Sequence, residues 1–179
     1  MDTLIPFSPE TLDTMVQGAV DKFFETMLPG CHISYQESWM VKPTNGEGEG
    51  REAPVTSDSA VVSMVGFIGS LNGVLYLYMH DSLARDVTCN FLGMEPDELD
   101  EEPDSTVNDA LGEMANMIAG TFKNGLCDIG YNCRLTIPSI LRGSQFSVET
   151  TSEVMRRVFQ FKAMGDVLTC DLLMKPADK

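Results

Sequence analysis

AVVSMVGFI (residues 60–68) and VLYLYMH (residues 74–80) are two runs of mostly apolar, β-branched and aromatic residues that lie close together in the chain. Residues of these types favour strands. The runs are joined through Leu71-Asn72-Gly73, and Asn-Gly is a strong signal for the turn of a β-hairpin. The sequence therefore predicts an antiparallel pair of strands, from which the rest of the fold can be worked out.

Helices and further strands flank this predicted hairpin. Two long amphipathic helices are expected, one beginning at Pro9 and ending before Pro29, the other running from about Asp104 to Asn124. Shorter elements are expected at 81–91 (a helix) and at 31–41, 134–141, 154–163 and 167–174 (strands). The order helix, three strands, two helices, three strands predicts an α+β fold, with two long helices packed on a largely antiparallel sheet.

The chain is expected to form one domain over residues 1–179. Within it, 42–58 is rich in Gly, Glu, Pro and Thr and is predicted to be a mobile loop, and 94–104 is predicted to be an acidic linker between helices. An offset of 99 residues superposes three core residues of the two long helices: Leu111 on Leu12, Met114 on Met15 and Phe122 on Phe23. An internal duplication and chance both explain three identities.

Charge and composition narrow the range of functions that this chain could have. Twelve Lys and Arg against 27 Asp and Glu give a net charge of −15, which disfavours binding to nucleic acid or to an anionic membrane. No apolar stretch is long enough for a membrane span, so a cytoplasmic location is expected. Five cysteines without a C-x-x-C pair and two isolated histidines predict neither a disulfide framework nor a metal site. Any catalysis by this chain would then have to rely on side-chain carboxylates and amides.

The second long helix separates into two faces when each residue is rotated by about 100°. One face is an apolar stripe expected to pack against the sheet, formed by Leu111, Met114, Ala115, Ile118, Phe122 and Leu126. The opposite face carries the polar side chains and two glycines, namely Asp109, Gly112, Glu113, Asn116, Gly120, Lys123 and Asn124.

This polar face differs from an ordinary solvated one. Glycine within a helix costs up to about 1 kcal/mol relative to alanine, and asparagine roughly 0.7. Gly112 and Gly120 would clear bulk from around Asn116 and let another molecule approach closely. Glu113 lies about 60° from Asn116, so the two side chains can reach one object. We therefore predict a binding or catalytic face.

The spacing of these residues is similar to that of the CheC/CheX chemotaxis phosphatases. That family has an acidic residue or Ser, a Glu four positions later, an Asn three further on, and a Pro some 22 residues after it. Asp109, Glu113, Asn116 and Pro138 match this pattern. CheC-like members carry two Glu and Asn motifs, whereas this chain has one, so it resembles the CheX branch, which implies a homodimer.

The resemblance implies hydrolysis of the phosphorylated aspartate of a CheY-like response regulator in chemotaxis or related two-component signalling. Asn116 would hold the attacking water, and Glu113 would pair with a lysine of the receiver domain. No intrinsic cofactor is implied, because the receiver domain supplies Mg²⁺. Gly112 and Gly120 would provide clearance and Lys123 would contribute to binding. Asp109 either contacts the partner or simply favours the start of the helix through the dipole.

Two alternatives remain at this point. A noncatalytic module that recognises receiver domains or flagellar switch components would use the same face, and only the effect of Asn116 on phosphoryl loss would distinguish it. An unrelated structural domain would instead use the two glycines to pack the helix against a neighbouring helix.

Overall fold

The structure is a computed structural model and describes residues 5–42, 50–52, 59–149 and 154–177. The helices are α1 (Pro9–Met27), α2 (Asp81–Leu92), α3 (Pro96–Asp100) and α4 (Asp104–Asp128). The strands are β1 (Ile33–Met40), β2 (Ala60–Gly69), β3 (Leu71–His80), β4 (Cys133–Leu135), β5 (Ser139–Gly143), β6 (Met155–Ala163) and β7 (Asp166–Pro176). The predicted mobile loop, 42–58, lies outside the described residues except for Lys42 and residues 50–52.

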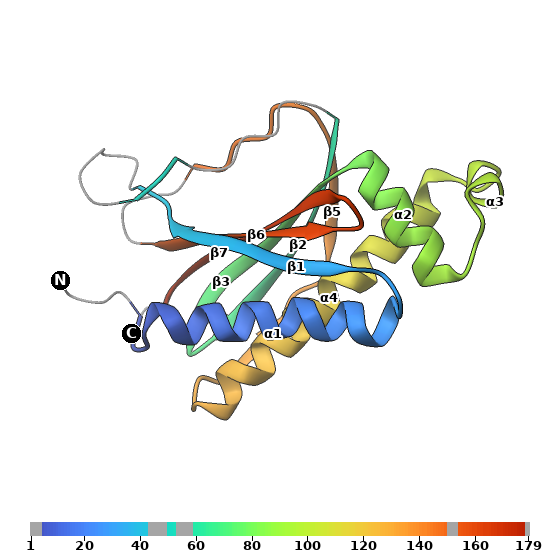
Figure 1. Ribbon diagram of the computed structural model, residues 1–179. Helices are drawn as coiled ribbons and strands as arrows, with labels where there is room; N and C mark the ends of the chain where they lie inside the picture. The colour runs from blue at the N-terminus through green and yellow to red at the C-terminus, as the bar shows by residue number, and fades with distance from the viewer. Residues whose placement is uncertain (1–4, 43–49, 53–58, 150–153, 178–179) are drawn as a thin grey trace.

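Among the described residues the sheet has seven strands in the order β1-β6-β7-β3-β2-β4, and β5 also pairs with β2. The pairings between named strands are antiparallel. Helices α1 and α4 cross on one face of this sheet (Figure 1). The predicted α+β fold, with two long helices on a largely antiparallel sheet, is confirmed.

The strand order is symmetrical about the central pair, β3 and β7. The hairpin partners of these two strands, β2 and β6, lie outside them. The first strand of each half then pairs with the hairpin of the other half, β1 with β6 and β4 and β5 with β2. Two copies of a unit of one helix and three strands would produce this arrangement, so the topology supports an internal duplication.

The hairpin of β2 and β3 is present, but its turn is not at Asn72-Gly73. Phe67 pairs with Gly73, so both strands continue past the predicted turn and the chain reverses around Ser70. A Cβ atom on Gly73 would lie 2.3 Å from the carbonyl oxygen of Leu173 and 2.4 Å from the Phe67 ring. Gly73 is therefore needed inside the strand, where its neighbours approach too closely for a side chain.

The predicted strand over 134–141 is interrupted in the structure. Residues 136–138 separate two short strands, β4 and β5, which both pair with β2. Pro138 has no N–H and cannot donate a hydrogen bond to a continuous ladder. The prediction of one strand was wrong because it ignored this proline.

The acidic segment 94–104, which lies between α2 and α4, contains the short helix α3. Leu99 of α3 is 2% exposed, and the side chains of Glu95 and Glu98 form a capping box at its start. An ion pair between Arg85 and Asp100 holds α3 beside α2. Burial of Leu99 thus orders part of a segment whose acidic composition alone predicts a solvated linker.

Helix α4 extends beyond its predicted end. It runs through Gly125 to Asp128, and Leu126 in this last turn is fully buried. A Cβ on Gly125 would lie 3.4 Å from the Met15 side chain, an ordinary contact distance, so α4 meets α1 at this glycine. Burying a leucine is worth roughly 1.5–3 kcal/mol, which outweighs the cost of a helical glycine.

The predicted apolar stripe of α4 forms part of the main core between the helices and the sheet. Its six residues are at most 1% exposed: Leu111, Met114, Ala115, Ile118, Phe122 and Leu126. Towards β1 and β6, the Arg157 guanidinium donates to both carboxylate oxygens of Asp13 on α1, at 2.6 and 2.7 Å. Burial of the stripe fixes the opposite, polar face of α4 relative to the sheet, and the Asp13–Arg157 pair fixes α1 in the same way.

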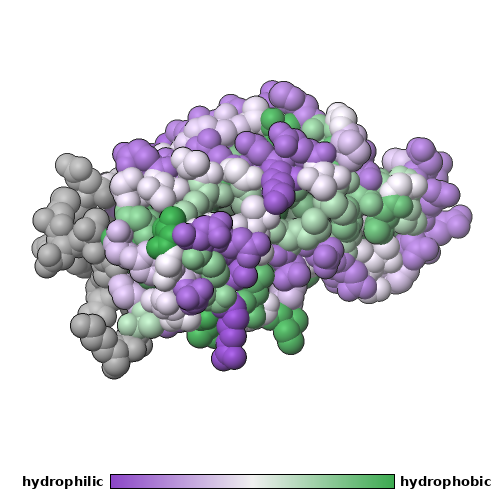
Figure 2. Space-filling model, turned by 90° about the horizontal axis from the view of Figure 1, so that it is seen from below, coloured by the Kyte–Doolittle hydropathy of each residue, from purple (hydrophilic) through white to green (hydrophobic). Residues whose placement is uncertain are grey.

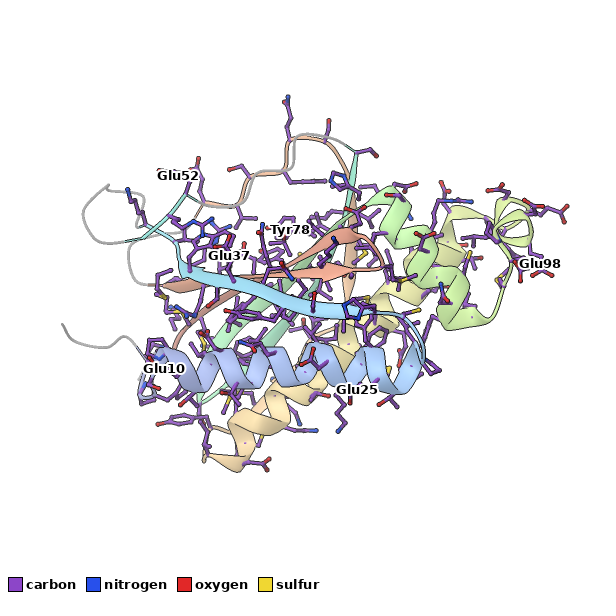
Figure 3. All side chains as sticks on the ribbon, in the orientation of Figure 1. Glu10, Glu25, Glu37, Glu52, Tyr78 and Glu98 are labelled. Carbon is purple, nitrogen blue, oxygen red and sulfur yellow. The ribbon has the colours of Figure 1, made fainter. Side chains whose placement is uncertain are left out.

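Buried polar side chains lie on the other face of the sheet. Arg156 forms hydrogen bonds of 2.5–3.2 Å to the carboxylate of Asp171, and the two side chains are 3% and 0% exposed. The Tyr78 hydroxyl, on the side of the sheet away from α1 (Figure 3), donates to Asp171. Arg156 also donates to the carbonyl oxygen of Val148 at 2.6 Å. This network ties the segment before β6 to the sheet.

Candidate functional site

The polar face of α4 places the predicted site residues on one surface. Gly112, Asn116 and Gly120 follow one another at four-residue spacing and therefore form a single stripe along the helix. Each of these residues is half-buried, whereas Glu113 beside them is exposed. The helix thus presents an amide and a carboxylate together, as the sequence predicts.

Asp109 and Lys123 lie at opposite ends of this surface. Each is seven residues from Asn116, which corresponds to about 10 Å along the helix axis. Asp109 is exposed and Lys123 is half-buried. They are therefore too far from Asn116 to act on the same atom as its carboxamide.

Four polar side chains of this surface make no contact of the polar kind with the described part of the protein. Within the described part of the chain, Asp109, Glu113, Asn116 and Lys123 make no hydrogen bond or ion pair with another side chain or with the backbone of another element. An asparagine in the middle of a helix that forms no bond within the protein lowers helix stability without a structural return. Its carboxamide is free to donate to and accept from another molecule.

The two glycines of the stripe face the edge of the sheet. A Cβ atom on Gly112 would lie 3.8 Å from the Cβ of Pro138, and one on Gly120 would lie 4.0 Å from a methyl group of Leu135. Both are ordinary van der Waals distances, so alanine would fit at either position. Internal packing does not require these glycines, and within the described residues the nearest atom to each belongs to the sheet edge and not to another helix. This argues against the purely structural alternative.

Residues that the sequence pattern did not single out complete the surroundings of the site. Arg142 of β5 donates to Asn108 of α4 and to Asp81 of α2, both at 2.9 Å, and so fixes the sheet edge to both helices. Ile137, next to Pro138, is 88% exposed. The proline inside an apolar run was the signal that could have revealed an interruption and an exposed side chain there.

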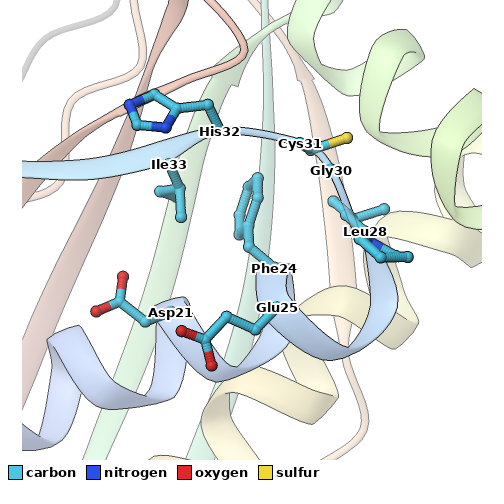
Figure 4. A pocket seen from close by; sticks show the side chains of 9 residues that line it. Asp21, Phe24, Glu25, Leu28, Gly30, Cys31, His32 and Ile33 are labelled. Atoms are coloured by element: carbon cyan, nitrogen blue, oxygen red, sulfur yellow. The ribbon is translucent and has the colours of Figure 1, made fainter.

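A hollow of about 490 Å³ lies at the C-terminal end of α1 (Figure 4). The carboxylates of Asp21 and Glu25 point to the same side, while the His32 ring points away from them. Partial burial, together with Glu25, raises the pKa of the Asp21 carboxyl. No group of three metal-ligating side chains is found among the described residues. The residues that line this hollow include none from α4, and none of them is an asparagine or glutamine that could act as Asn116 is predicted to act.

Comparison with known proteins identifies the family. Residues 61–162 match the CheX family, described as "Chemotaxis phosphatase CheX". The matched region is more than half of the chain and includes α4, Glu113, Asn116 and Pro138. The chain belongs to the CheX family. No helix in the described part of this CheX-family chain is long and apolar enough to cross a membrane.

The individual CheX proteins that this chain resembles are distant relatives, with 20–26% sequence identity. The CheY-P phosphatase CheX of Thermotoga maritima is 26% identical over 98 residues, which cover 54% of this chain and 61% of that protein, or less than two thirds of its length. CheX from Desulfovibrio desulfuricans has a TM-score of 0.72 at 21% identity, covering 92% of this chain and 99% of that one. CheX in the CheX-CheY-BeF3-Mg+2 complex from Borrelia burgdorferi has a TM-score of 0.70 at 20% identity, covering 92% and 97%. The fold is shared over nearly the whole chain.

Proposed function

We propose that this protein is a phosphatase that hydrolyses the aspartyl phosphate of a CheY-like receiver domain. The observation that carries the proposal is the pairing of Glu113 and Asn116 on one exposed surface of α4, where neither side chain has an internal partner among the described residues. The name of the Thermotoga relative as a CheY-P phosphatase and the Borrelia complex of CheX with CheY support the choice of substrate.

Asn116 would position the attacking water. In the reaction the water oxygen forms a bond to phosphorus, the bond from phosphorus to the aspartate oxygen breaks, and the aspartate leaves as a carboxylate. Both protons of the water remain on the inorganic phosphate that is released. Phosphoryl transfer is accelerated chiefly by positioning the reactants and stabilising charge. A carboxamide can accept a hydrogen bond from the water while donating another, and it carries no charge that would repel the phosphoryl oxygens.

Glu113 would fix the orientation of the two proteins through an ion pair with the receiver's lysine. The receiver also brings Mg²⁺ as part of the substrate, so this chain needs no metal of its own. Lys123 and Asp109 would contact the partner at the two ends of the surface. Asp109 also lies near the N-terminus of α4, where the helix dipole favours a carboxylate with or without a partner.

Gly112 and Gly120 would keep the approach to Asn116 open. A side chain at either position would stand one turn from the carboxamide on the same stripe. Pro138 shapes the sheet edge opposite Gly112 and need not touch the substrate. We further propose a homodimer, from the resemblance to the CheX branch, which sedimentation of the purified protein would test.

The decisive measurement is the loss of phosphate from a phosphorylated CheY-like receiver, with and without this protein. We expect roughly 100-fold acceleration, equivalent to about 2.7 kcal/mol, that collapses in Asn116→Ala. Glu113→Ala is expected to weaken binding and slow the reaction. Asn90→Ala, which removes an exposed asparagine of α2 outside this surface, serves as the matched control and should retain wild-type activity.

The other outcome would identify a different function. If the wild-type protein binds the receiver but does not accelerate phosphate loss, the surface of α4 belongs to a noncatalytic binding module for receivers. Unfolding curves for each variant must match the wild type, so that loss of activity is not loss of fold.

A further inference from the structure

The interruption between β4 and β5 is a β-bulge. Between the Phe67–Leu135 pair and the Met64–Ser139 pair, β2 has two residues and the edge strand has three, Thr136–Pro138. One residue of the edge is therefore extra. Such a residue disturbs the ladder locally and redirects side chains, and bulges are often found beside active sites.

Thr136 holds this bulge in a defined shape. Its N–H donates to the carbonyl oxygen of Gly66 at 2.8 Å, and its hydroxyl oxygen accepts from the N–H of Gly66 at 2.9 Å. A Cβ atom on Gly66 would lie only 3.0 Å from this hydroxyl oxygen, so the glycine makes room for the threonine. The backbone that leads into Ile137 is thus held to Gly66 of β2 by two hydrogen bonds.

The bulge turns Ile137 into solvent. Its side chain is 88% exposed, whereas the other exposed large hydrophobic residues in the described part of the chain are only 43–49% exposed. Leu135 and Ile140, on either side, pack against the core. Ile137 is therefore far more exposed than its apolar neighbours Leu135 and Ile140, which pack against the core.

Ile137 also borders the candidate site. Leu135 faces Gly120 and Pro138 faces Gly112, so Ile137 lies in the short segment that runs beside the stripe containing Asn116. Hydrophobic and hydrophilic residues are interspersed on the face seen from below (Figure 2). A partner that brings a phosphoryl group to Asn116 must approach this edge and would cover the isoleucine.

We propose that Ile137 is an apolar anchor for the receiver domain, burying its side chain against the receiver surface next to the phosphorylated aspartate. This inference rests on the proposed phosphatase function and adds a source of affinity to it. Glu113 supplies a charged contact, and the anchor supplies desolvated apolar area near the centre of the same surface. Because the bulge is already rigid, little conformational entropy is lost when the receiver binds.

The test compares Ile137→Thr with Ile129→Thr. Threonine keeps the β-branched shape but removes apolar area, and the exposed Ile129 lies at the end of α4, about 20 Å from Asn116 along the helix axis. The probe is a CheY-like receiver activated with beryllium fluoride and Mg²⁺. We expect Ile137→Thr to raise its Kd roughly 10- to 100-fold, equivalent to about 1.4–2.8 kcal/mol, with Ile129→Thr unchanged.

Kinetics with the phosphorylated receiver provide the second readout. Ile137→Thr should raise KM and leave kcat within about twofold at saturation, since uniform binding is lost and chemistry is not. Equal Kd values for both variants and the wild type would overturn the anchor and leave the phosphatase proposal standing. Absence of binding and of acceleration by the wild type would overturn both. A change in the sedimentation of Ile137→Thr alone would identify a second copy of this chain as the occupant and also overturn the anchor.

Discussion

A Cβ atom on Gly112 would lie 3.8 Å from the Cβ of Pro138, so the helix that carries the candidate site and the edge of the sheet meet one turn before Asn116. The two residues are 26 positions apart in the chain, yet both belong to the same site. The distance leaves space for one methyl group without strain. A methyl group can therefore be added at Gly112 without unfolding the protein.

Gly112→Ala and Gly120→Ala are expected to stabilise the fold and impair function. Alanine is favoured over glycine within a helix by up to about 1 kcal/mol, and both positions can accept its methyl group. The same methyl groups would obstruct the approach of a receiver to Asn116. Urea unfolding should give equal or higher stability, and receiver dephosphorylation should be slower.

Gly18→Ala is the matched control for these two variants. Gly18 is an exposed glycine within α1, and a Cβ built there meets no atom within 4 Å. It should gain similar stability and keep full activity. Unchanged activity in all three variants would show that the glycines of α4 are not needed for clearance.

The elements that the sequence predicts well are those whose pattern is local. The apolar stripe of α4 repeats with the helical period, and Glu113 and Asn116 lie on its other face whatever the helix packs against. Helix α1 begins at Pro9 with Ser8 as its cap for the same reason, since the Ser8 hydroxyl accepts from Thr11 at 3.3 Å. Nothing beyond neighbouring residues was needed for these predictions.

Features that depend on distant contacts could not be predicted. The Asn72-Gly73 turn was placed wrongly because Gly73 serves the close approach of Leu173, a residue 100 positions away. The exposure of Ile137 depends on how β4 and β5 each pair with β2. An apolar run predicts burial when it is read alone, and only the register of the whole edge shows which residue is extra.

Gly73→Ala is expected to be strongly destabilising, in contrast to the glycines of α4. Its methyl group would overlap a backbone oxygen at 2.3 Å, which cannot move aside without displacing β7. Overpacking of this kind costs about 1–3 kcal/mol and sometimes more. Thermal unfolding should show a lower Tm for Gly73→Ala than for Gly18→Ala. Equal Tm values would mean that the strands separate easily at this position.

Breaking the Arg156–Asp171 pair should cost more than replacing both partners. Asp171→Ala leaves a buried guanidinium without its carboxylate, a change that typically costs about 3–5 kcal/mol. The double variant Arg156→Met with Asp171→Leu removes both charges and is expected to be more stable than Asp171→Ala. Urea unfolding of the two variants checks this. If the single variant is the more stable one, solvent reaches Arg156.

Tyr78 is expected to make the fold sensitive to high pH. Burial raises the pKa of its hydroxyl well above the ordinary value of about 10, and the neighbouring Asp171 carboxylate raises it further. The folded state therefore keeps the phenol proton in a range where the unfolded chain releases it. The contribution of this proton to stability is complete below pH 10 and is lost as pH rises above it.

The free energy of unfolding should consequently fall above pH 10, by at most about 1.4 kcal/mol per pH unit for Tyr78. Tyr78→Phe removes the titrating group and should make this slope shallower. Part of the slope remains in the variant, because burial also raises the pKa of Tyr76. Urea titrations between pH 8 and 11, with absorbance at 295 nm to follow ionisation, measure both effects. Identical slopes for wild type and variant would show that the Tyr78 hydroxyl ionises in the folded protein, which its burial beside a carboxylate should prevent.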